Sequence, residues 1–492
     1  MTELWVILGG LLLICQIIGA IFAVDAVLYG KTPQGTLAWA LGLVLLPYLT
    51  VPLYLVFGGR RFEGYVRARR KRRGGIANFT VELGRTLEPY QAEFRPHSPG
   101  DRAIKKLVST PCTRANAAEL LIDGQDFFPA LWSAIDSARR DLLVQFYIIK
   151  DDATGRQFQS RLLAASARGV NVRLLYDAIG SSKLPRSYVE ALRDGGVQVA
   201  EFRSFRGPRT HLQVNFRNHR KLVVTDARTA IIGGLNIGDE YNHLDRHLTP
   251  WRDTGVLLRG PSVVECQLAF AEDWHHSTGQ VLPLQWDAVP AAPESAGTTT
   301  ATPGHPNRSS ADARVVIAPT GPADELPTGA LMVLHLIASA SRRLWIATPY
   351  FVPDASIVEG LQLAALRGVD VRIITPRNND NRFVKLAMLS FEPDILPSGV
   401  RMFDHQPGFM HQKVILSDDA AAVGSLNLDN RSMRINFELT ALIADAPFVA
   451  AVERMLASDL ASSREVTLGS LRRRSLAVRI AARIARLAAP VL

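Results

Sequence analysis

The chain has 492 residues, of which 47% are hydrophobic and 21% are charged. This composition is that of a folded protein and excludes a disordered chain, and the length provides for two or three domains. The formal net charge of +10 indicates an anionic partner, either a nucleic acid, an acidic lipid or a phosphorylated substrate. The cysteines Cys15, Cys112 and Cys266 are too few and too scattered for a disulfide framework or a zinc site, and fit a reducing, cytoplasmic environment.

Two apolar runs occupy the beginning of the chain. Residues 4–24 contain Gln16 as their only strongly polar member, and residues 36–57 contain no charge. Each run is long enough to cross a hydrocarbon core. A cleaved signal peptide is the alternative for the first run, but its leader carries Glu3 and no positive charge, and a second run follows at once. Residues 1–58 are therefore predicted to form two transmembrane helices.

The charges beside these runs predict their orientation. The sequence "RRFEGYVRARRKRR" at 60–73 contains eight Lys or Arg directly after the second run, whereas the loop between the runs has only Lys31. By the positive-inside rule, both termini and the whole remainder of the chain are cytoplasmic. The basic run also suits contact with anionic headgroups, although its topological role alone would account for it.

The remainder of the chain contains an internal repeat. "DLLVQFYII" (141–149) matches "RLWIATPYFV" (343–352), and "ARGVNVRLLYD" (167–177) matches "LRGVDVRIITP" (366–376). In each copy an apolar strand pattern is followed by a helical pattern, a glycine and a second strand. Strand, helix and strand in duplicate predict an α/β fold with a pseudo-twofold axis.

The repeat divides the chain after the membrane runs into five parts. A stretch rich in Pro, Ser, Thr and Ala without periodicity separates the two copies and predicts a flexible linker. The predicted parts are a basic juxtamembrane segment and connector (59–114), a first half (115–284), the linker (285–313), a second half (314–468) and a basic amphipathic C-terminal helix (469–492).

A His-x-Lys motif occurs once in each half. "HRKLVVTD" begins at His219 and "HQKVILSD" begins at His411, although only nine of the 56 basic residues are lysine. The two lysines, Lys221 and Lys413, therefore indicate a site that needs a compact ammonium rather than a planar guanidinium. Residues two apart on a strand project to the same face, so each His and Lys can converge on one small anion.

Each motif is followed by further polar residues. Asp226 and Asp418 come where the strand turns, and we interpret them as structural anchors because a carboxylate would repel an anionic substrate. Asn236 in "GGLN" and Asn427 in "GSLN" follow a second short strand in each half. Their amides are suited to donate hydrogen bonds to phosphoryl oxygens.

A carboxylate in each half is a candidate for orienting a histidine. An imidazole that attacks or moves protons needs its second nitrogen held by an acceptor, and Asp253 and Glu438 lie on matching strands further along. Tyr147 and Tyr350 also occupy matching places, and we expect them in the core or the wall of a pocket. A single His-x-Lys is more often an ordinary exposed strand, but two complete copies favour a catalytic site. No metal site is expected.

The two motifs resemble the His-x-Lys-x4-Asp signature of the phospholipase D superfamily. The N-terminal runs, the stretch "TLAWALGLVLLPYLTVPLYLVFGGRR" and the charged C-terminus resemble bacterial cardiolipin synthases, and the resemblance covers nearly the whole chain. It implies two pseudo-symmetric phospholipase D-like α/β/α halves that share one active site at their interface, without a cofactor or metal. The catalytic residues that it implies are His219, Lys221, Asp226, His411, Lys413 and Asp418.

The resemblance also implies a reaction. Two phosphatidylglycerols are joined to cardiolipin, with release of glycerol, through a phosphohistidine on His219, while His411 serves as general acid. The implied partners are anionic phospholipids (phosphatidylglycerol and cardiolipin) in a bacterial cell membrane, with a multi-pass anchor and a cytoplasmic catalytic part. Nucleic acid is not expected, because no aromatic platform for bases is evident and the spans hold the chain beside lipid. The residues themselves establish only phosphodiester chemistry, so a phospholipase D-type phosphodiesterase using water or another alcohol is the alternative. The second substrate, the oligomeric state and the role of the linker stay open. The near-symmetry of the two halves also leaves open which histidine is the nucleophile when the resemblance is set aside.

The C-terminal segment has two interpretations. At helical spacing its apolar and basic residues separate onto opposite faces, which predicts either a docking helix or a helix lying in a membrane interface. The apolar face has Leu476, Ile480, Ile484, Leu487 and Val491, and the basic face has Arg479, Arg483 and Arg486.

Overall fold

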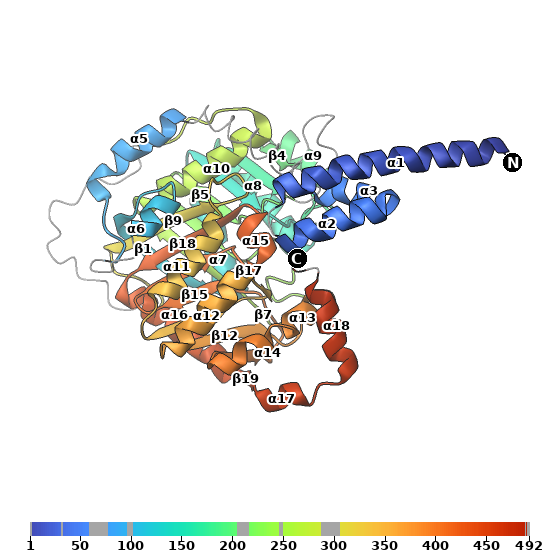
Figure 1. The fold of residues 1–492 in the computed structure, drawn as a ribbon. Coiled ribbons are helices and arrows are strands. Elements are labelled where there is room, and N and C mark those ends of the chain that lie inside the picture. Colours follow the sequence, from blue (N-terminus) through green and yellow to red (C-terminus); the bar gives the residue numbers. More distant parts are fainter. Residues whose placement is uncertain are drawn as a thin grey trace. The chain divides into compact units, whose positions relative to one another are not determined.

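The protein is described by a computed structural model (Figure 1). Two compact units are present: Met1–Gly75 with Arg203–Phe216, and Ile76–Phe202 with Arg217–Leu492. We call them the N-terminal unit and the catalytic unit. The structure describes residues 2–30, 33–58, 77–95, 102–203, 216–245, 249–286, 306–487 and Ala489. The basic run at 60–73 and most of the predicted linker therefore lie outside the described residues.

The N-terminal unit contains one helix of membrane length. Helix α1 spans Thr2–Tyr29, and within the described residues only its Gly9–Tyr29 part is long and apolar enough to cross a membrane, with a mean hydropathy of 2.5. The second predicted span is not one continuous helix. It forms α2 (Pro33–Leu45) and α3 (Pro47–Phe57), because Pro47 has no N–H to continue the helix.

Polar contacts accompany this break. The hydroxyl of Thr50 donates to the carbonyls of Gly42 and Leu46 at 2.8 and 2.7 Å, which satisfies groups near the interrupted turn. Tyr54 on α3 donates to the buried carboxylate of Asp25 on α1 at 2.9 Å. The exterior of α1 stays apolar, as lipid contact requires. Its exposed apolar side chains include Leu11, Leu12, Leu13, Ile14, Ile17 and Ile21.

The catalytic unit contains one continuous sheet to which both halves contribute. Its order is β19-β13-β12-β10-β15-β16-β18-β9-β1-β8-β6-β5-β2-β3-β4, and the halves join where β1 pairs antiparallel with β9. Outward from this seam, β1-β8-β6-β5-β2-β3 in the first half corresponds to β9-β18-β16-β15-β10-β12 in the second. The predicted duplication of an α/β fold is confirmed.

The strands have the following bounds. In the first half they are β1 (Thr113–Ile122), β2 (Asp141–Phe146), β3 (Asn171–Asp177), β4 (Gln198–Phe202), β5 (Leu222–Thr225), β6 (Thr229–Gly233), β7 (Trp251–Arg252) and β8 (Thr254–Arg259). In the second half they are β9 (Ala313–Thr320), β10 (Arg343–Ala347), β11 (Phe351–Val352), β12 (Asp370–Pro376), β13 (Arg401–His405), β14 (Phe409–Met410), β15 (Val414–Ser417), β16 (Ala420–Gly424), β17 (Leu428–Asp429), β18 (Glu438–Ala444) and β19 (Ser463–Val466).

Helices cover the sheet and correspond between the halves. Asp152 and Asp354 cap two matching helices by accepting hydrogen bonds from Gly155 and Ile357. In the first half the helices are α7 (Asp123–Ser137), α8 (Ala153–Ala167), α9 (Arg186–Asp194) and α10 (Ser262–Thr278). In the second they are α11 (Thr328–Ser339), α12 (Ala355–Leu366), α13 (Arg382–Leu389), α14 (Glu392–Ile395), α15 (Asn430–Arg434) and α16 (Ala446–Ala461).

The predicted connector and linker contribute to this unit where they are described. Helix α5 (Ala77–Leu87) packs on α10 through Leu83 and Leu87, and α6 (Arg102–Leu107) packs on α11. Within the predicted linker, Asn307 accepts a hydrogen bond from Leu120 on β1 at 2.9 Å. The predicted C-terminal helix is two helices, α17 (Leu468–Arg472) and α18 (Leu476–Arg486).

Candidate active site

The two His-x-Lys segments lie just before strands rather than within them. Strand β5 begins at Leu222 and β15 at Val414, so the expectation of a His and Lys inside each strand is wrong by one to three residues. The reason is that these extended segments pair with the opposite half. The His219 amide donates to the Phe437 carbonyl at 2.9 Å, and the His411 amide donates to the Arg252 carbonyl at 2.6 Å.

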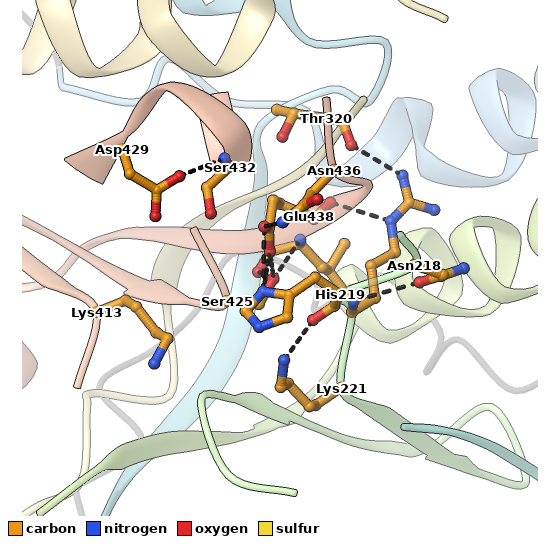
Figure 2. A network of polar contacts seen from close by, with 12 residues as sticks. Asn218, His219, Lys221, Thr320, Lys413, Ser425, Asp429, Ser432, Asn436 and Glu438 are labelled. Atoms are coloured by element: carbon orange, nitrogen blue, oxygen red, sulfur yellow. Dashed lines mark hydrogen bonds and ion pairs between the residues drawn. The ribbon is translucent and has the colours of Figure 1, made fainter. Parts of the chain in front are cut away.

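The histidines and their carboxylates are exchanged between the halves. His219 Nδ1 lies 2.9 Å from Oε2 of Glu438, and His411 Nδ1 lies 2.8 Å from Oδ2 of Asp253. All four side chains are buried. Each half therefore supplies a histidine and also the carboxylate that holds the other half's histidine. Figure 2 shows the first of these pairs, His219 with Glu438.

The two carboxylates are held differently. Ser425 donates to Glu438 at 2.5 Å, and Asn436 donates to the same carboxylate at 3.2 Å, as Figure 2 shows. At the place matching Ser425 the first half has Gly234, where a Cβ would lie 2.0 Å from an Asp253 oxygen. The glycine thus leaves space for the Asp253 carboxylate, and the serine instead binds the carboxylate of its own half.

Burial and neighbouring cations have opposite effects on these carboxylates. Burial alone raises the pKa of Asp253, but Lys413 and His411 outweigh it and hold that pKa below its usual value. Burial likewise raises the pKa of Glu438, and His219 and Lys221 reverse the shift. Both carboxylates are therefore ionised at neutral pH and accept the Nδ1–H of their histidines. This leaves each Nε2 with its lone pair, which is the form that attacks or accepts a proton.

The pKa values of both lysines are lowered in this site. Burial lowers the pKa of Lys221 to about 7, and Lys413 contributes to the shift. Burial also lowers the pKa of Lys413 to about 8. The Lys221 ammonium donates to the His219 carbonyl at 2.6 Å, and Lys413 Nζ lies 2.7 Å from Nδ1 and 3.2 Å from Nε2 of His411. The two buried ammonium groups repel each other, so a bound anion would stabilise the charged form of both lysines.

The histidines are neutral for the same reasons. Burial lowers the pKa of His411 to about 3, with Lys413 adding to the effect. Burial also lowers the pKa of His219, although Glu438 opposes it. An anionic substrate would raise both values, because negative charge favours the imidazolium.

The two aspartates of the signature lie at the other end of their strands. The Asp226 carboxylate accepts backbone hydrogen bonds from residues 139–141 at 2.7 to 2.9 Å. The Asp418 carboxylate accepts them from residues 341–343 at 2.7 to 3.0 Å. Both residues have positive φ values, 52° and 48°. The structure thus places them where they tie a turn to the start of a neighbouring strand.

The two asparagines are already engaged in part. Asn236 accepts from the Ile148 amide at 3.1 Å and donates to the Tyr241 hydroxyl at 3.2 Å. Asn427 is hydrogen-bonded to Asp429. A carboxamide nitrogen carries two hydrogens, so each side chain retains a second donor.

Comparison with known proteins agrees with this arrangement. Residues 131–255 and 333–460 match the family described as "Cardiolipin synthase, PLD-like domain", and residues 12–59 match a phospholipase D-nuclease N-terminal region. Cardiolipin synthase A of Pseudomonas entomophila is 44% identical over 491 residues, which cover 98% of both chains. The same enzyme of Pseudomonas aeruginosa is 43% identical over 489 residues, 99% of this chain and 96% of its own.

The chain belongs to the cardiolipin synthase family. The sequence-based recognition of that family is confirmed. The crystal structure of phosphatidylserine synthase from Haemophilus influenzae superposes with a TM-score of 0.58 at 15% identity and covers 80% of this chain and all of its own. At that identity the likeness concerns the fold alone.

This chain also has two buried aspartates that the sequence analysis did not single out. Arg220, between His219 and Lys221, donates to Asp273 on α10 at 2.9 Å. Gln412, the matching residue of the second motif, donates to Asp459 on α16 at 2.6 Å. The available signal was an aspartate in the helix that follows each orienting carboxylate, 20 residues after Asp253 and 21 residues after Glu438. These contacts anchor the middle residue of each motif on the side opposite to the catalytic pair.

The tyrosines beside the histidines differ in their partners. Tyr147 packs edge-on against His219 with ring centroids 5.0 Å apart, and its side chain is hydrogen-bonded to Arg217. Tyr350 packs on His411 at 6.2 Å, and its hydroxyl donates to Asp380 at 2.8 Å. Sequence matching located both tyrosines but gave no indication of this difference in charge.

Proposed function

We propose that this enzyme transfers a phosphatidyl group from one phosphatidylglycerol to the glycerol hydroxyl of a second, giving cardiolipin and glycerol. Membership of the family supports this activity. The observation that carries the mechanism is the crossed pair of histidines, each with its Nδ1 held by a buried carboxylate of the other half. Two pre-oriented imidazoles beside two lysines suit a double displacement at one phosphorus.

In the first displacement His219 is the nucleophile, the role that the resemblance implies for the first motif. Its Nε2 attacks the phosphorus of the donor, a P–N bond forms, and the P–O bond to glycerol breaks. The anionic donor raises the pKa of the His411 imidazole, so this histidine takes up a proton at Nε2 when the donor binds. It then gives that proton to the departing glycerol oxygen, which would otherwise be a poor leaving group. Glu438 stabilises the positive charge that develops on His219 through the contact at Nδ1.

In the second displacement His411 acts as a base and His219 is the leaving group. His411, now neutral, takes the proton of the incoming hydroxyl, and the oxygen attacks the phosphorus of the phosphohistidine. The P–N bond breaks and His219 is regenerated with its lone pair. Lys221 and Lys413 neutralise the non-bridging oxygens in both steps, and Asn236 and Asn427 supply the remaining hydrogen bonds.

The test uses the purified full chain in vesicles that contain isotopically distinct phosphatidylglycerol and phosphatidylethanolamine. Mass spectrometry of the products should show cardiolipin with both phosphatidyl groups from phosphatidylglycerol, and one glycerol for each cardiolipin. Phosphatidic acid as the main product would contradict the proposal and establish a hydrolase. Cardiolipin with one group from phosphatidylethanolamine would revise the second substrate.

The membrane arrangement belongs to the same proposal. Helix α1 crosses the membrane, and α2 with α3 forms a kinked return, so that both termini and the catalytic unit face the cytoplasm. The apolar exterior of α1 and the distribution of basic residues support this. A cysteine at Lys31 should react with an impermeant maleimide added to intact cells, and a cysteine at Arg228 should react only after lysis. Reaction of both in intact cells would contradict the proposed orientation.

A further inference from the structure

The C-terminal helix α18 packs on the second half through its small side chains. It begins at Leu476, after Ser475 accepts a capping hydrogen bond from Val478, and it contacts α13. The side chains that it buries are small, namely Ala482 and Ala485. Ala485 belongs to the hydrophobic core of the second half. The large apolar residues of the helix are therefore not what attaches it to the protein.

Arginines supply the attachment instead. Arg486 forms an ion pair with Asp394 on α14 and lies 4.2 Å from the ring centroid of Phe391. Arg483 lies 3.4 Å from the same aspartate. Before the helix, Arg474 binds Glu392 at 2.5 Å. Because these arginines turn toward the protein, the opposite face of α18 turns away from it.

The outward face is a stripe of large apolar side chains. Its members occur at helical spacing and remain accessible to a large extent: Leu476 at 67%, Ile480 at 51%, Ile484 at 59% and Leu487 at 82%. They border a hollow of about 670 Å³ whose other walls include Leu389, Pro393 and Leu471. A contiguous exposed apolar surface of this kind marks a contact with another apolar body.

We propose that this face of α18 inserts into the acyl region at the surface of an anionic bilayer and holds the second half of the catalytic unit against it. The residues around the stripe identify the occupant. Arg472, Arg473 and Arg479 are exposed beside it, and an apolar face edged by arginines fits acyl chains below anionic headgroups. Two copies meeting through this face would bring arginines against arginines, which opposes self-association.

The contact continues toward the catalytic residues. Helix α18 packs on α13, whose N-terminal cap is Asn381. The preceding residue, Asp380, accepts the hydrogen bond from Tyr350, and Tyr350 contacts the His411 ring. The proposed membrane contact is thus made by a helix that packs on α13, and α13 follows directly after the Asp380 contact with Tyr350 beside His411. This inference goes beyond the proposed reaction and does not depend on which alcohol accepts the phosphatidyl group.

The depth of α18 in the bilayer can be measured without turnover. In the full chain with its three native cysteines replaced by alanine, an Ile484→Cys variant is labelled with an environment-sensitive fluorophore and placed in phosphatidylglycerol-containing vesicles. Arg228→Cys, in the exposed turn between β5 and β6, is the control. We expect a blue shift and quenching by nitroxide attached to lipid acyl chains at 484, and neither effect at 228.

Each outcome decides the proposal. Absence of lipid quenching at 484 overturns it. A blue shift without lipid quenching that grows with protein concentration in detergent also overturns it, in favour of a second copy of the chain. The double variant Ile480→Asn with Ile484→Asn gives an independent measurement: cardiolipin formation should fall at least threefold on long-chain vesicles and stay unchanged with soluble short-chain phosphatidylglycerol. Equal loss on both substrates would indicate a structural role only and contradict the proposal.

Discussion

The two ends of the catalytic site carry the same reacting groups in opposite electrostatic surroundings. Beside His219, the hydroxyl of Tyr147 is hydrogen-bonded to Arg217, and the charges of the buried Asp177 and of Arg431 also act on it. Beside His411, the hydroxyl of Tyr350 donates to the carboxylate of Asp380. The histidines, lysines and orienting carboxylates are thus duplicated. Two arginines and one aspartate act on Tyr147, whereas the charged neighbours of Tyr350 are the carboxylates of Asp380 and Asp429.

The matched sequence positions show where the halves have diverged. When His219 and His411 are aligned, Arg217 corresponds to Phe409, and when Asn236 and Asn427 are aligned, Arg431 corresponds to Glu240. Phe409 packs on Trp251 in the first half, and Glu240 forms an ion pair with Lys150 at 2.5 Å. The groups that we propose to act on the phosphorus are therefore kept in both halves, and the surrounding positions distinguish one end of the site from the other.

Removing either histidine should have the largest effect and should reveal whether the two ends differ in role. His219→Ala and His411→Ala should each lower cardiolipin formation by a factor of about 10⁴ or more. A donor with a phenolate leaving group needs no acid in the first displacement, so His411→Ala should still release one equivalent of phenolate. It should then stall with the phosphatidyl group on the protein, whereas His219→Ala should release none.

The measurement is radiolabelled phosphorus retained on each variant after denaturation without acid, followed by peptide mapping. Label on His219 in the His411→Ala variant agrees with the proposed roles. Label trapped in His219→Ala and absent from His411→Ala would reverse them. A complete absence of label would count against the covalent mechanism.

Exchanging lysine for arginine should have the next largest effect at both ends. Lys221→Arg and Lys413→Arg retain the charge, but a forked guanidinium is larger than an ammonium and displaces the phosphate from the attacking nitrogen. A misplacement of about 1 Å costs about 10²-fold in rate. Lys385→Arg is the matched control, because its ammonium binds Pro376 and Asp404 outside the catalytic group. The measurement is the turnover rate of each variant in detergent micelles. Near-normal rates in both Lys221→Arg and Lys413→Arg would contradict the need for an ammonium.

The pH dependence should follow the two lysines. Burial lowers the pKa of Lys221 to about 7 and that of Lys413 to about 8, so Lys221 loses its charge as the pH rises through 7 and Lys413 loses its charge as the pH rises through 8. Because kcat/KM reports the free enzyme, it should fall by about tenfold per pH unit, or more steeply, above pH 8. Glu438 raises the pKa of Lys221, so the residual activity of Glu438→Gln should begin to fall at lower pH. A kcat/KM that is constant up to pH 9 would exclude this explanation.

Much of the site was predictable because its groups repeat. The duplicated α/β halves, both His-x-Lys pairs and the two carboxylates were all identified from matched patterns in the chain. The exchange of Glu438 and Asp253 between the halves was not, because spacing along the sequence does not say which half a strand end faces. The strand starts were misplaced for the same reason: the backbone before β5 and β15 binds the opposite half.

Two other features depended on contacts that no local pattern contains. The second apolar run was predicted as one span, but Pro47 divides it into two helices, and Thr50 binds carbonyls of the interrupted turn. In α18 the separation of apolar and basic residues was correctly predicted, yet the face that docks is set by Asp394, which lies far away in the sequence. Amphipathicity predicts that a helix has an apolar face and a polar face, but it does not predict which face packs on the protein.

Neutralising the charges around the tyrosines should have the smallest effect and tests the asymmetry directly. Arg217→Gln removes a cation near His219, and Asp380→Asn removes an anion near Tyr350 while keeping an acceptor for its hydroxyl. One charge at a partly exposed position is worth ~1 kcal/mol for an anionic ligand, or about fivefold in affinity. We therefore expect the KM for phosphatidylglycerol to rise about three- to tenfold in Arg217→Gln and to stay equal or fall in Asp380→Asn, with kcat changed little in either. Arg228→Gln, which removes a charge from an exposed turn, controls for net charge. A KM that moves in the same direction and by the same factor in both variants would show that the two ends of the site are electrostatically equivalent for the substrate.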